Sequence, residues 1–282
     1  MSVKQRTLKS EFSLNGKGLH TGKQVTATFK PAEENFGYRI RRMDLEGSPE
    51  IPALAEYVKL MDRASCLEKD GVCVFTMEHA MAALYGSGID NCLIELSGEE
   101  FPILDGSAKY YVEEIEKVVF EEQKADRRYF TVKEQMEFCS EDGQTKITLL
   151  PDTDYNINLV VAYDSPYLQM QYATYSEKVT DFAKEIAPCR TFVFLRELEM
   201  LLQHNLIKGG DLDNAIVIVD REISQEEVNR LAKLFNHDSI EVKQGILNNL
   251  DLYFDNEPAR HKLLDVIGDL SLCGRFIKGR VI

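Results

Sequence analysis

The chain has 282 residues, of which 44% are hydrophobic and 28% are charged, as in a globular enzyme of one or two domains. Its formal net charge of -14 argues against a nucleic-acid partner, because such a surface repels phosphate backbones. The N-terminus lacks the apolar segment of a signal peptide, and no apolar run approaches the roughly 20 residues that cross a bilayer. We therefore expect a cytoplasmic protein without a transmembrane segment. The six cysteines are scattered, which favours reduced thiols and leaves a Cys ligand to zinc open.

Two pairs of segments show an internal similarity of the chain. Residues 22–31 and 143–151 each contain a Gly turn, an alternating strand and a Pro that ends it. Residues 85–96 and 204–218 each combine a helix end, a Gly turn, Asp-Asn and an apolar strand. The pattern predicts an α+β fold of two similar two-layer α/β sandwich halves, with helices packed on mostly antiparallel sheets. Chance similarity of turn motifs is the alternative.

The expected halves are residues 1–125 and 126–282, because the charged stretch 121–128 lies between an amphipathic helix and a new strand at 129–132. The first half then carries Glu78 and His79, and the second carries His261 and Asp265. A site that draws on both halves would lie in the cleft between them, where ligand pockets tend to form.

A helix is expected near the end of the chain. Asp255 or Asn256 can cap it, and Pro258 suits its first turn, where a missing N–H has no consequence. Arg260 falls on the apolar side of this helix, and we expect it to reach out to solvent.

Three polar residues of this helix fall on one stripe. At about 100° per residue, His261, Asp265 and Asp269 share a face. The opposite side is apolar and consists of Leu263, Leu264, Val266, Ile267 and Leu270. Taken alone, such a stripe is usually a solvated polar face.

The earlier helix changes that interpretation. Thr76 is a good N-cap, and Glu78 and His79 fall in the first turn. Two His and one carboxylate around an open position form the ligand set of a catalytic zinc site, with His79, His261 and Asp265 as the ligands. A helix-start histidine without a metal is the alternative for His79.

The remaining polar groups near these residues suggest roles in hydrolysis of an amide or ester. Glu78 is free to act as general base toward the water that zinc acidifies. Asp269 can orient a ligand imidazole, and Lys262 brings positive charge for an oxyanion or phosphate. The predicted cofactor is one Zn²⁺ per chain.

At these residues the chain resembles the UDP-3-O-acyl-N-acetylglucosamine deacetylases, zinc enzymes of lipid A synthesis in Gram-negative bacteria. The resemblance covers nearly the whole chain. It is carried in order by residues 16–22 (GKGLHTG), 76–79 (TMEH), 104–108 (LDGSA), 190–192 (RTF), 209–210 (GG) with 213–215 (DNA), and 260–265 (RHKLLD) with 268–269 (GD).

The resemblance implies that His79, His261 and Asp265 bind zinc and that Glu78 activates the water that releases acetate from the sugar acetamide. Thr191 and Lys262 would assist the oxyanion. The family has an inserted βαβ unit with an apolar acyl passage, which falls here at about residues 192–218. The implied substrate contacts are His20, Tyr163, Phe192, Phe194, Leu195, Leu198, Gly210, Leu212, Ala215 and Val217. Of these, Tyr163 aligns with a residue that stacks on uracil, and ordinary core is the alternative for the apolar ones.

One family feature is absent from these 282 residues. The family has a further His in a Lys-Ser-Gly-His type segment after the last strand, and neither His204 nor His237 matches it. Some relatives continue into a fused hydroxyacyl-carrier-protein dehydratase, so we expect a piece of a longer chain that binds zinc but turns over slowly. A zinc amidohydrolase of another substrate and a non-catalytic acyl-sugar-nucleotide binding module are the alternatives.

Overall fold

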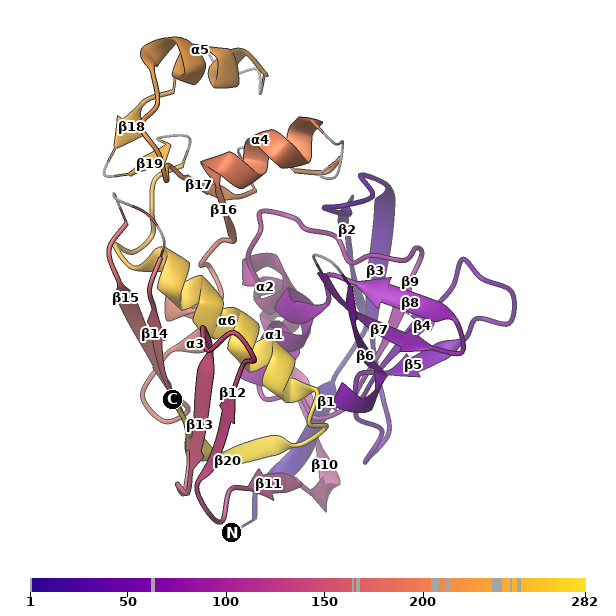
Figure 1. Ribbon diagram of the computed structural model, residues 1–282. Coiled ribbons are helices and arrows are strands. Elements are labelled where there is room, and N and C mark those ends of the chain that lie inside the picture. Colours follow the sequence, from indigo (N-terminus) through magenta and orange to yellow (C-terminus); the bar gives the residue numbers. More distant parts are fainter. Residues whose placement is uncertain are drawn as a thin grey trace.

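The computed structural model describes residues 2–61, 64–163, 165, 168–203, 208–210, 214–234, 240–243, 245–247 and 250–282. A long helix runs diagonally through the molecule, with one sheet on either side of it and a smaller lobe at the top (Figure 1). His204, Leu212 and His237, to which the sequence predictions refer, lie outside the described residues.

The first half is built on a five-stranded sheet in the order β2-β3-β9-β4-β5. Its neighbouring strands are antiparallel except β4 and β9, which are parallel. Every second side chain of β3 is buried, at Val25, Ala27 and Phe29, as the alternating pattern predicts. The elements of this half are β2 (Phe12–Lys17), β3 (Gln24–Pro31), β4 (Tyr38–Arg42), β5 (Glu50–Pro52), α1 (Glu78–Gly86), β9 (Cys92–Leu96) and α2 (Lys109–Val118).

The second half contains a sheet with the path β12-β13-β20-β14-β15, and β11 also pairs with β20. The β14–β20 and β11–β20 pairs are parallel, and the others are antiparallel. Its elements are β11 (Tyr129–Thr131), β12 (Met136–Cys139), β13 (Lys146–Leu150), β14 (Tyr155–Val161), β15 (Gln171–Ser176), α3 (Phe182–Glu185), α6 (Glu257–Ser271) and β20 (Phe276–Val281).

The two sheets have the same topology. β2, β3, β9, β4 and β5 have the order and relative directions of β12, β13, β20, β14 and β15. In each half one helix, α1 or α6, comes directly before the central strand. The prediction of two similar α+β halves is confirmed, and residues 22–31 and 143–151 contain the equivalent strands β3 and β13.

The other part of the predicted internal similarity is wrong. Residues 216–218 form β17, which belongs to a separate four-stranded sheet, and the equivalent of β9 is β20. The similarity between residues 85–96 and 204–218 misleads because turn residues fix the local backbone and not the sheet that the next strand joins.

Each half carries an insertion between its last sheet strand and its central helix. In the first half this is η1 (Ala55–Tyr57) with the antiparallel strands β6 (Val58–Met61), β7 (Ala64–Lys69) and β8 (Val72–Phe75). In the second half it contains β16 (Phe192–Phe194), α4 (Leu195–Gln203), β17 (Ile216–Ile218), α5 (Gln225–Leu234), β18 (Val242–Lys243) and β19 (Ile246–Leu247). We call this second one the upper insertion, because it forms the lobe at the top of Figure 1.

The upper insertion contains a βαβ unit, since β16 and β17 are parallel and α4 lies between them in the chain. It extends beyond the expected range of residues 192–218, because β19 and β18 continue the same sheet. Its own core includes Leu195, Leu198, Val217 and Leu231.

The start of the chain lies beside the end of the first half. β1 (Lys4–Leu8) pairs antiparallel with β10 (Phe120–Asp126). Directly after β10, Arg127 forms a buried ion pair with Asp90 (Nη2 to Oδ2, 2.8 Å). The boundary between residues 125 and 126 stays a prediction.

Helices α1 and α6 pack against each other and connect the two halves. Gly268 allows their close approach, since a Cβ at this position would lie 2.3 Å from the backbone oxygen of Glu78. Neither these helices nor the other described ones are long and apolar enough to span a membrane.

Candidate metal centre

Helix α1 places Glu78 and His79 in its first turn. The predicted N-cap is wrong: Met77 occupies the N-cap position, and no side chain caps the helix. The hydroxyl of Thr76 instead donates to Glu100 Oε1 (3.0 Å). His79 is buried and Glu78 is half-buried, so this helix end points into the protein.

Helix α6 places His261 and Asp265 one turn apart. Pro258 lies in its first turn, as predicted, and Asn256 is the N-cap residue but makes no capping hydrogen bond. Along the predicted stripe His261 is buried, Asp265 is half-buried and Asp269 is exposed. The stripe therefore leads from the interior to the surface.

His79, His261 and Asp265 converge, although the two histidines are far apart in the chain. Asp265 Oδ1 lies 3.4 Å from His261 Nε2 and 3.8 Å from His79 Nε2. The ring centroids of the two imidazoles are 5.0 Å apart. One donor atom from each of the three residues lies within 4.8 Å of the others. This spacing allows all three to contact one cation.

Asp265 Oδ1 is buried and accepts no hydrogen bond from any described residue. A buried carboxylate oxygen without a partner is strongly destabilising unless a cation or donor satisfies it. Its environment therefore fits a metal ion, and two His with one carboxylate is a ligand set typical of catalytic zinc.

The two histidines are suited to bind a metal as neutral rings. Burial lowers the pKa of His79, and it lowers the pKa of His261 to about 4. His261 Nδ1 lies 2.9 Å from the carbonyl oxygen of Cys189 and donates its proton there, which leaves Nε2 free to face Asp265. Within the described part of the chain Asp269 bonds to neither imidazole, and its orienting role stays a prediction.

The pKa values of Glu78 and Asp265 are shifted in opposite directions. Burial raises the pKa of Glu78 to about 7, and the nearby charge of Asp265 acts in the same direction. Burial would also raise the pKa of Asp265, but His261 and Lys262 together lower it. Lys262 Nζ donates to Asp265 Oδ2 (3.0 Å).

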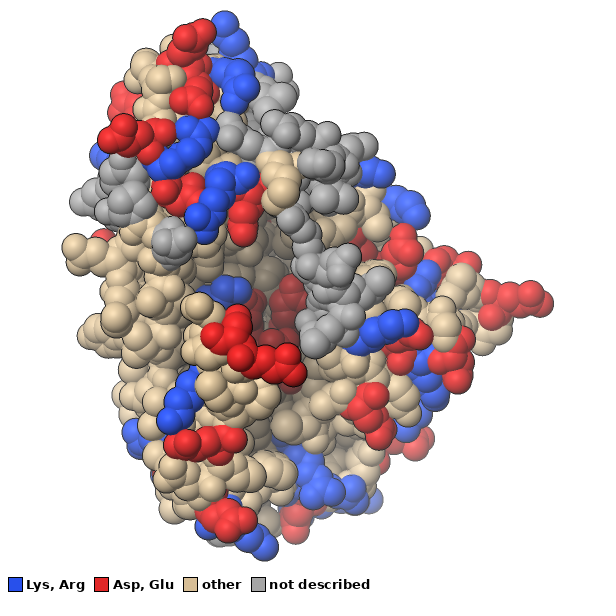
Figure 2. Space-filling view, viewed as in Figure 1, with Lys and Arg blue, Asp and Glu red and all other residues tan. Residues whose placement is uncertain are grey.

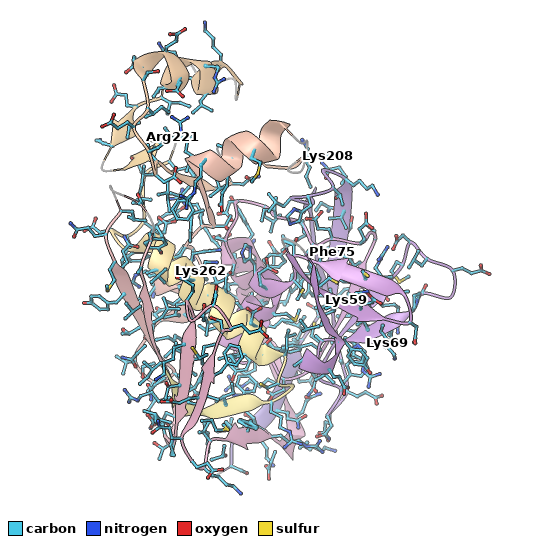
Figure 3. All side chains as sticks on the ribbon, in the orientation of Figure 1. Lys59, Lys69, Phe75, Lys208, Arg221 and Lys262 are labelled. Atoms are coloured by element: carbon cyan, nitrogen blue, oxygen red, sulfur yellow. The ribbon has the colours of Figure 1, made fainter. Side chains whose placement is uncertain are left out.

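The face seen in Figure 2 is hollowed below the upper insertion and has acidic side chains inside the hollow. Lys262 lies on α6 below the insertion (Figure 3). Its Nζ also lies 5.4 Å from the ring centroid of Phe192.

An aromatic cluster connects the upper insertion to the metal centre. Phe192 lies 6.4 Å from His261, 5.7 Å from Tyr163 and 6.1 Å from Phe194 between ring centroids. The predicted acyl contacts Phe192 and Phe194 and the predicted uracil contact Tyr163 therefore belong to one cluster.

The other predicted acyl contacts have different environments. Leu195, Leu198 and Val217 are buried in the core of the upper insertion, where ordinary packing accounts for them. Ala215 and Gly210 are half-buried, and Leu212 is outside the described residues.

Glu100 fixes the loop that contains His20. Its carboxylate is buried and accepts bonds from the backbone N–H groups of His20 (2.9 Å) and Thr21 (3.0 Å) and from the hydroxyls of Thr21 (2.8 Å) and Thr76 (3.0 Å). Because Glu100 bonds to both His20 and Thr76, the loop lies close to the start of α1.

Thr191 lies where the upper insertion leaves the second half. Its N–H donates to the Gly106 carbonyl (2.7 Å), and its own carbonyl accepts from the Ile216 N–H (2.8 Å). The structure thus connects Thr191 to the loop at residues 104–108, where Asp105 is close enough to influence the pKa of His79.

The side chain of Arg260 is partly exposed (21%), as expected, but its head group is also held by protein groups. Its guanidinium lies over the ring of Phe254 (4.1 Å) and donates to the carbonyl of Glu185 and to Asn256 Oδ1 (both 2.9 Å). The aliphatic stem explains its place on the apolar side of the helix, because it can pack while its head group bonds to polar atoms.

Sequence reasoning did not predict the structural roles of several groups that hold the site together. The main ones are the Cys189 carbonyl, the Arg190–Glu257 ion pair and Gly268. A backbone carbonyl leaves no trace in the sequence, and the partners of a buried ion pair 67 positions apart cannot be matched from spacing. Gly268 in the middle of a helix was a usable sign, because glycine disfavours helix interiors unless close packing requires it.

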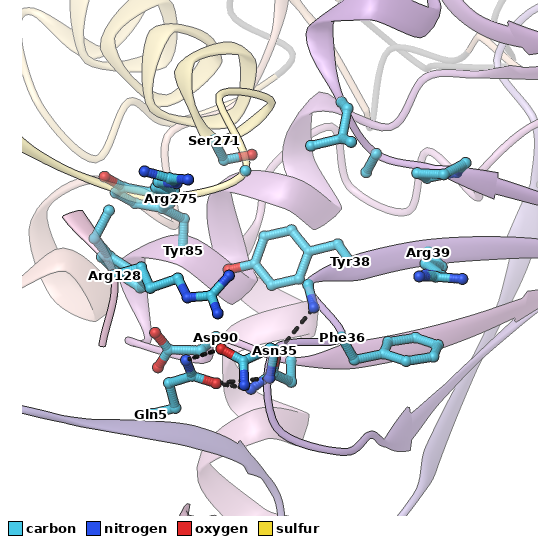
Figure 4. A pocket seen from close by; sticks show the side chains of 17 residues that line it. Gln5, Asn35, Phe36, Tyr38, Arg39, Tyr85, Asp90, Arg128, Ser271 and Arg275 are labelled. Atoms are coloured by element: carbon cyan, nitrogen blue, oxygen red, sulfur yellow. Dashed lines mark hydrogen bonds between the residues drawn. The ribbon is translucent and has the colours of Figure 1, made fainter. Parts of the chain in front are cut away.

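A separate cavity of about 300 Å³ contains none of the predicted site residues. It lies between the first-half sheet and the end of α6, with Tyr38, Arg128 and Asp90 around it (Figure 4). The metal centre is therefore not part of this cavity.

Two similar α+β halves thus bring two His and one Asp together between their central helices, a ligand set found in zinc enzymes. Residues 5–240 and 234–282 match the family LpxC, described as UDP-3-O-acyl N-acetylglycosamine deacetylase. The chain belongs to this family.

Individual relatives match almost the whole chain. It is 53% identical over 281 residues to the bifunctional enzyme LpxC/FabZ of Bacteroides thetaiotaomicron, covering 99% of this chain and 61% of that protein. It is 40% identical over 280 residues to the UDP-3-O-acyl-N-acetylglucosamine deacetylase of Myxococcus xanthus, covering 99% of this chain and 81% of that protein. The chain thus spans about 60% of the LpxC/FabZ relatives that it matches.

Proposed function

We propose that this chain hydrolyses the N-acetyl group of a UDP-3-O-acyl-N-acetylglucosamine, giving acetate and the free amine, with one zinc ion per chain. The observation that carries the proposal is the convergence of His79, His261 and Asp265 around an unpartnered carboxylate oxygen. Family membership supplies the substrate class, since the family is described by this activity.

His79, His261 and Asp265 would hold the zinc. When bound, zinc supplies a Lewis acid that polarises a carbonyl and acidifies water. These residues suit zinc binding, because both imidazoles are neutral and the Cys189 carbonyl orients the ring of His261.

Glu78 precedes a ligand without being one, so its carboxylate is available to take a proton from the attacking water. The attack forms a C–O bond and leaves an oxyanion on the former carbonyl carbon. Collapse of this species breaks the C–N bond, and the proton taken by Glu78 passes to the leaving amine. Lys262, and Thr191 at the loop of Gly106, are proposed to stabilise the oxyanion.

The acyl chain is proposed to pass along Phe192 and Phe194, because these rings lead from the metal centre into the upper insertion. Each methylene buried there contributes about 0.8 kcal/mol to binding. His20, Tyr163, Gly210 and Ala215 are proposed to contact the sugar nucleotide or the start of the acyl chain.

We also propose that the chain acts as the deacetylase part of a bifunctional LpxC/FabZ protein in the cytoplasm. The support is the high identity to such proteins in two organisms, of which the chain covers 61% and 60%.

Two measurements test the proposal. Elemental analysis should find close to one zinc per chain, and His79→Ala or His261→Ala should reduce this below about one tenth, whereas His20→Ala should leave it unchanged. Wild-type protein should release acetate from the UDP-linked acyl sugar faster than the Glu78→Gln variant does. This variant should still bind zinc. Release from an acetylated peptide but not from the acyl sugar would contradict the substrate class, and zinc-independent release would contradict the metal.

A further inference from the structure

A buried ion pair lies directly beside the metal centre and has no part in the proposed reaction. Glu257 is fully buried, and the exposed fraction of Arg190 is 6%. Arg190 donates from Nε to Glu257 Oε1 (2.8 Å) and from Nη2 to Oε2 (3.1 Å). Glu257 Oε2 also accepts from the Tyr253 N–H (2.7 Å). The carboxylate is therefore held in one orientation.

Glu257 also bonds to the main chain. The backbone N–H of Arg190 donates to Glu257 Oε1 (3.0 Å). This N–H belongs to the same peptide group as the Cys189 carbonyl, which accepts from His261 Nδ1 (2.9 Å). Because a trans peptide is planar, its N–H and C=O point in opposite directions. The Cys189–Arg190 peptide group thus lies between the carboxylate and the imidazole.

The arrangement forms a closed ring of contacts. Glu257 and His261 lie four residues apart on α6, so they are one helical turn apart on the same face. The peptide group connects their side chains through two hydrogen bonds. A peptide that donates to a carboxylate is polarised, and its carbonyl becomes a better acceptor.

We propose that Glu257 is a positioning residue for the metal ligand His261 and that it acts through the Cys189–Arg190 peptide group. By fixing the plane of this peptide, Glu257 holds His261 in the tautomer with a proton on Nδ1 and turns its Nε2 toward Asp265 and His79. Metal-ligating histidines usually bond directly to a carboxylate or a carbonyl, and here the carbonyl carries the influence of a carboxylate. The inference rests on the proposed zinc function.

The test compares variants by zinc affinity in chelator competition. Glu257→Gln keeps the shape of the side chain and removes its charge. We expect its zinc affinity to fall about 10- to 100-fold, the range for residues that orient metal ligands. Arg190→Lys keeps the backbone N–H that bonds to Glu257, so its affinity should fall by no more than about threefold.

The matched control is Asp90→Asn, which breaks a second well-buried carboxylate–arginine pair, with Arg127, beyond the far end of α1. It should lower the stability of the fold and leave the zinc affinity unchanged. A general loss of stability therefore cannot imitate the expected result.

The second readout is the ¹⁵N NMR signal of the His261 ring in the metal-free protein. Wild type should show a protonated Nδ1 and a bare Nε2, and Glu257→Gln should shift these signals toward a mixture of tautomers. If wild-type protein bound no zinc, the proposed function would fail, but this readout would still test the role of Glu257.

Unchanged affinity and unchanged His261 signals in Glu257→Gln would overturn the inference. If that variant does not fold because the Arg190 charge is left buried, the double variant Glu257→Gln/Arg190→Met is measured instead. It removes both charges and tests whether zinc affinity depends on Glu257. It should show the same loss of zinc affinity. Wild-type affinity in the double variant, or failure of both variants to fold, would mean that the pair is purely structural.

Discussion

Three acidic residues near the site, Glu100, Glu257 and Asp265, differ in how their oxygens are satisfied. Glu100 and Glu257 each accept four hydrogen bonds or ion-pair contacts from the protein. Asp265 bonds only through Oδ2, to Lys262, and its Oδ1 has no donor within the described residues. Glu100 and Glu257 therefore hold backbone segments in place, whereas Asp265 keeps one oxygen available to bind a cation.

This difference predicts an opposite effect of Asp265→Asn on binding and on stability. The variant should bind no zinc, because an amide is a poor ligand in place of a carboxylate. The metal-free protein should become more stable by about 1 kcal/mol, since the new amide can donate to the bare imidazole nitrogen beside it. Urea unfolding with and without zinc measures both effects. Stabilisation of the variant by zinc to the wild-type extent would contradict the assignment.

Glu100 predicts a loss of stability at the His20 loop. Glu100→Ala leaves the N–H groups of His20 and Thr21 without their acceptor, and we expect a loss of about 3 kcal/mol in the free energy of unfolding. Glu99→Ala is the matched control, because among the described residues the Glu99 side chain forms just an exposed ion pair with Lys23, and its loss should cost less than about 1 kcal/mol. Similar losses in both variants, measured by urea unfolding, would refute the organising role of Glu100.

The sequence predicted the residues of the site better than it predicted their hydrogen-bond partners. The two His and the Asp that converge in the structure were predicted because metal chemistry restricts the side chains that can bind an ion. The predicted cap at Thr76 was wrong because a helix cap is a local partner, whereas the actual partner Glu100 comes from another part of the fold. The bond from Arg260 to the Glu185 carbonyl was not predicted, because it also joins distant parts of the chain.

Among the secondary-structure elements, the crossing of α1 and α6 sets the geometry of the site. His79 and Glu78 lie at the start of one helix, and Asp265 lies one turn before Gly268 on the other. A small change in the distance between the helices therefore moves the ligands relative to one another.

Gly268→Ala should increase this distance. Alanine in place of glycine normally stabilises a helix interior by up to about 1 kcal/mol. Here the added Cβ would meet the Glu78 backbone oxygen at 2.3 Å, so we expect a net loss of about 2 kcal/mol and weaker zinc binding. Thermal unfolding and chelator competition measure the two effects.

Gly86→Ala is the control for this crossing. Its Cβ would clash with the Phe182 ring at 2.4 Å, at the end of α1 away from His79. It should destabilise the fold and leave zinc affinity at the wild-type level. If both variants bound zinc equally well, the helix crossing would not determine the ligand geometry.

Sequence periodicity predicts individual strands, but it does not predict which sheet a strand joins. The strands β3 and β13 were found because alternation and a terminal Pro are local signals. Which strand is equivalent to β9 is decided by long-range pairing, and β20 occupies that position in its sheet while β17 pairs within the upper insertion. Local sequence similarity therefore could not separate these two strands.

Across the whole molecule, the two halves share a sheet topology but differ in what they insert before the central helix. The insertion of the first half is a small antiparallel sheet, and the upper insertion is larger and has a core of its own. The upper insertion closes back onto the first half, where the N–H of Gly209 donates to the carbonyl of Leu19 (3.0 Å). Lys208, next to this contact, lies beside the upper ends of β2 and β3 (Figure 3).

Gly209 is the point where the upper insertion and the His20 loop touch backbone to backbone. A Cβ on Gly209 would lie 2.1 Å from the carbonyl oxygen of Gly18, and the carbonyl of Gly209 accepts from Asn214 Nδ2 (2.9 Å). Both sides of this contact are main chain, so no side-chain rotation can relieve the clash. Gly209→Ala must therefore move the insertion away from the loop.

The expected result is a defect in substrate binding without a defect in metal binding. The KM for the acylated substrate should rise about tenfold or more, because misplacement by about 1 Å of groups that position a substrate has effects of this size. Zinc content should stay at the wild-type level, since His79, His261 and Asp265 lie on helices outside the insertion. Gly98→Ala, whose Cβ makes only an ordinary 3.4 Å contact with Val25, should leave both quantities unchanged. An unchanged KM in Gly209→Ala would mean that the acylated substrate does not depend on contact between the upper insertion and the first half, and the acyl path along Phe192 and Phe194 would then have to be abandoned.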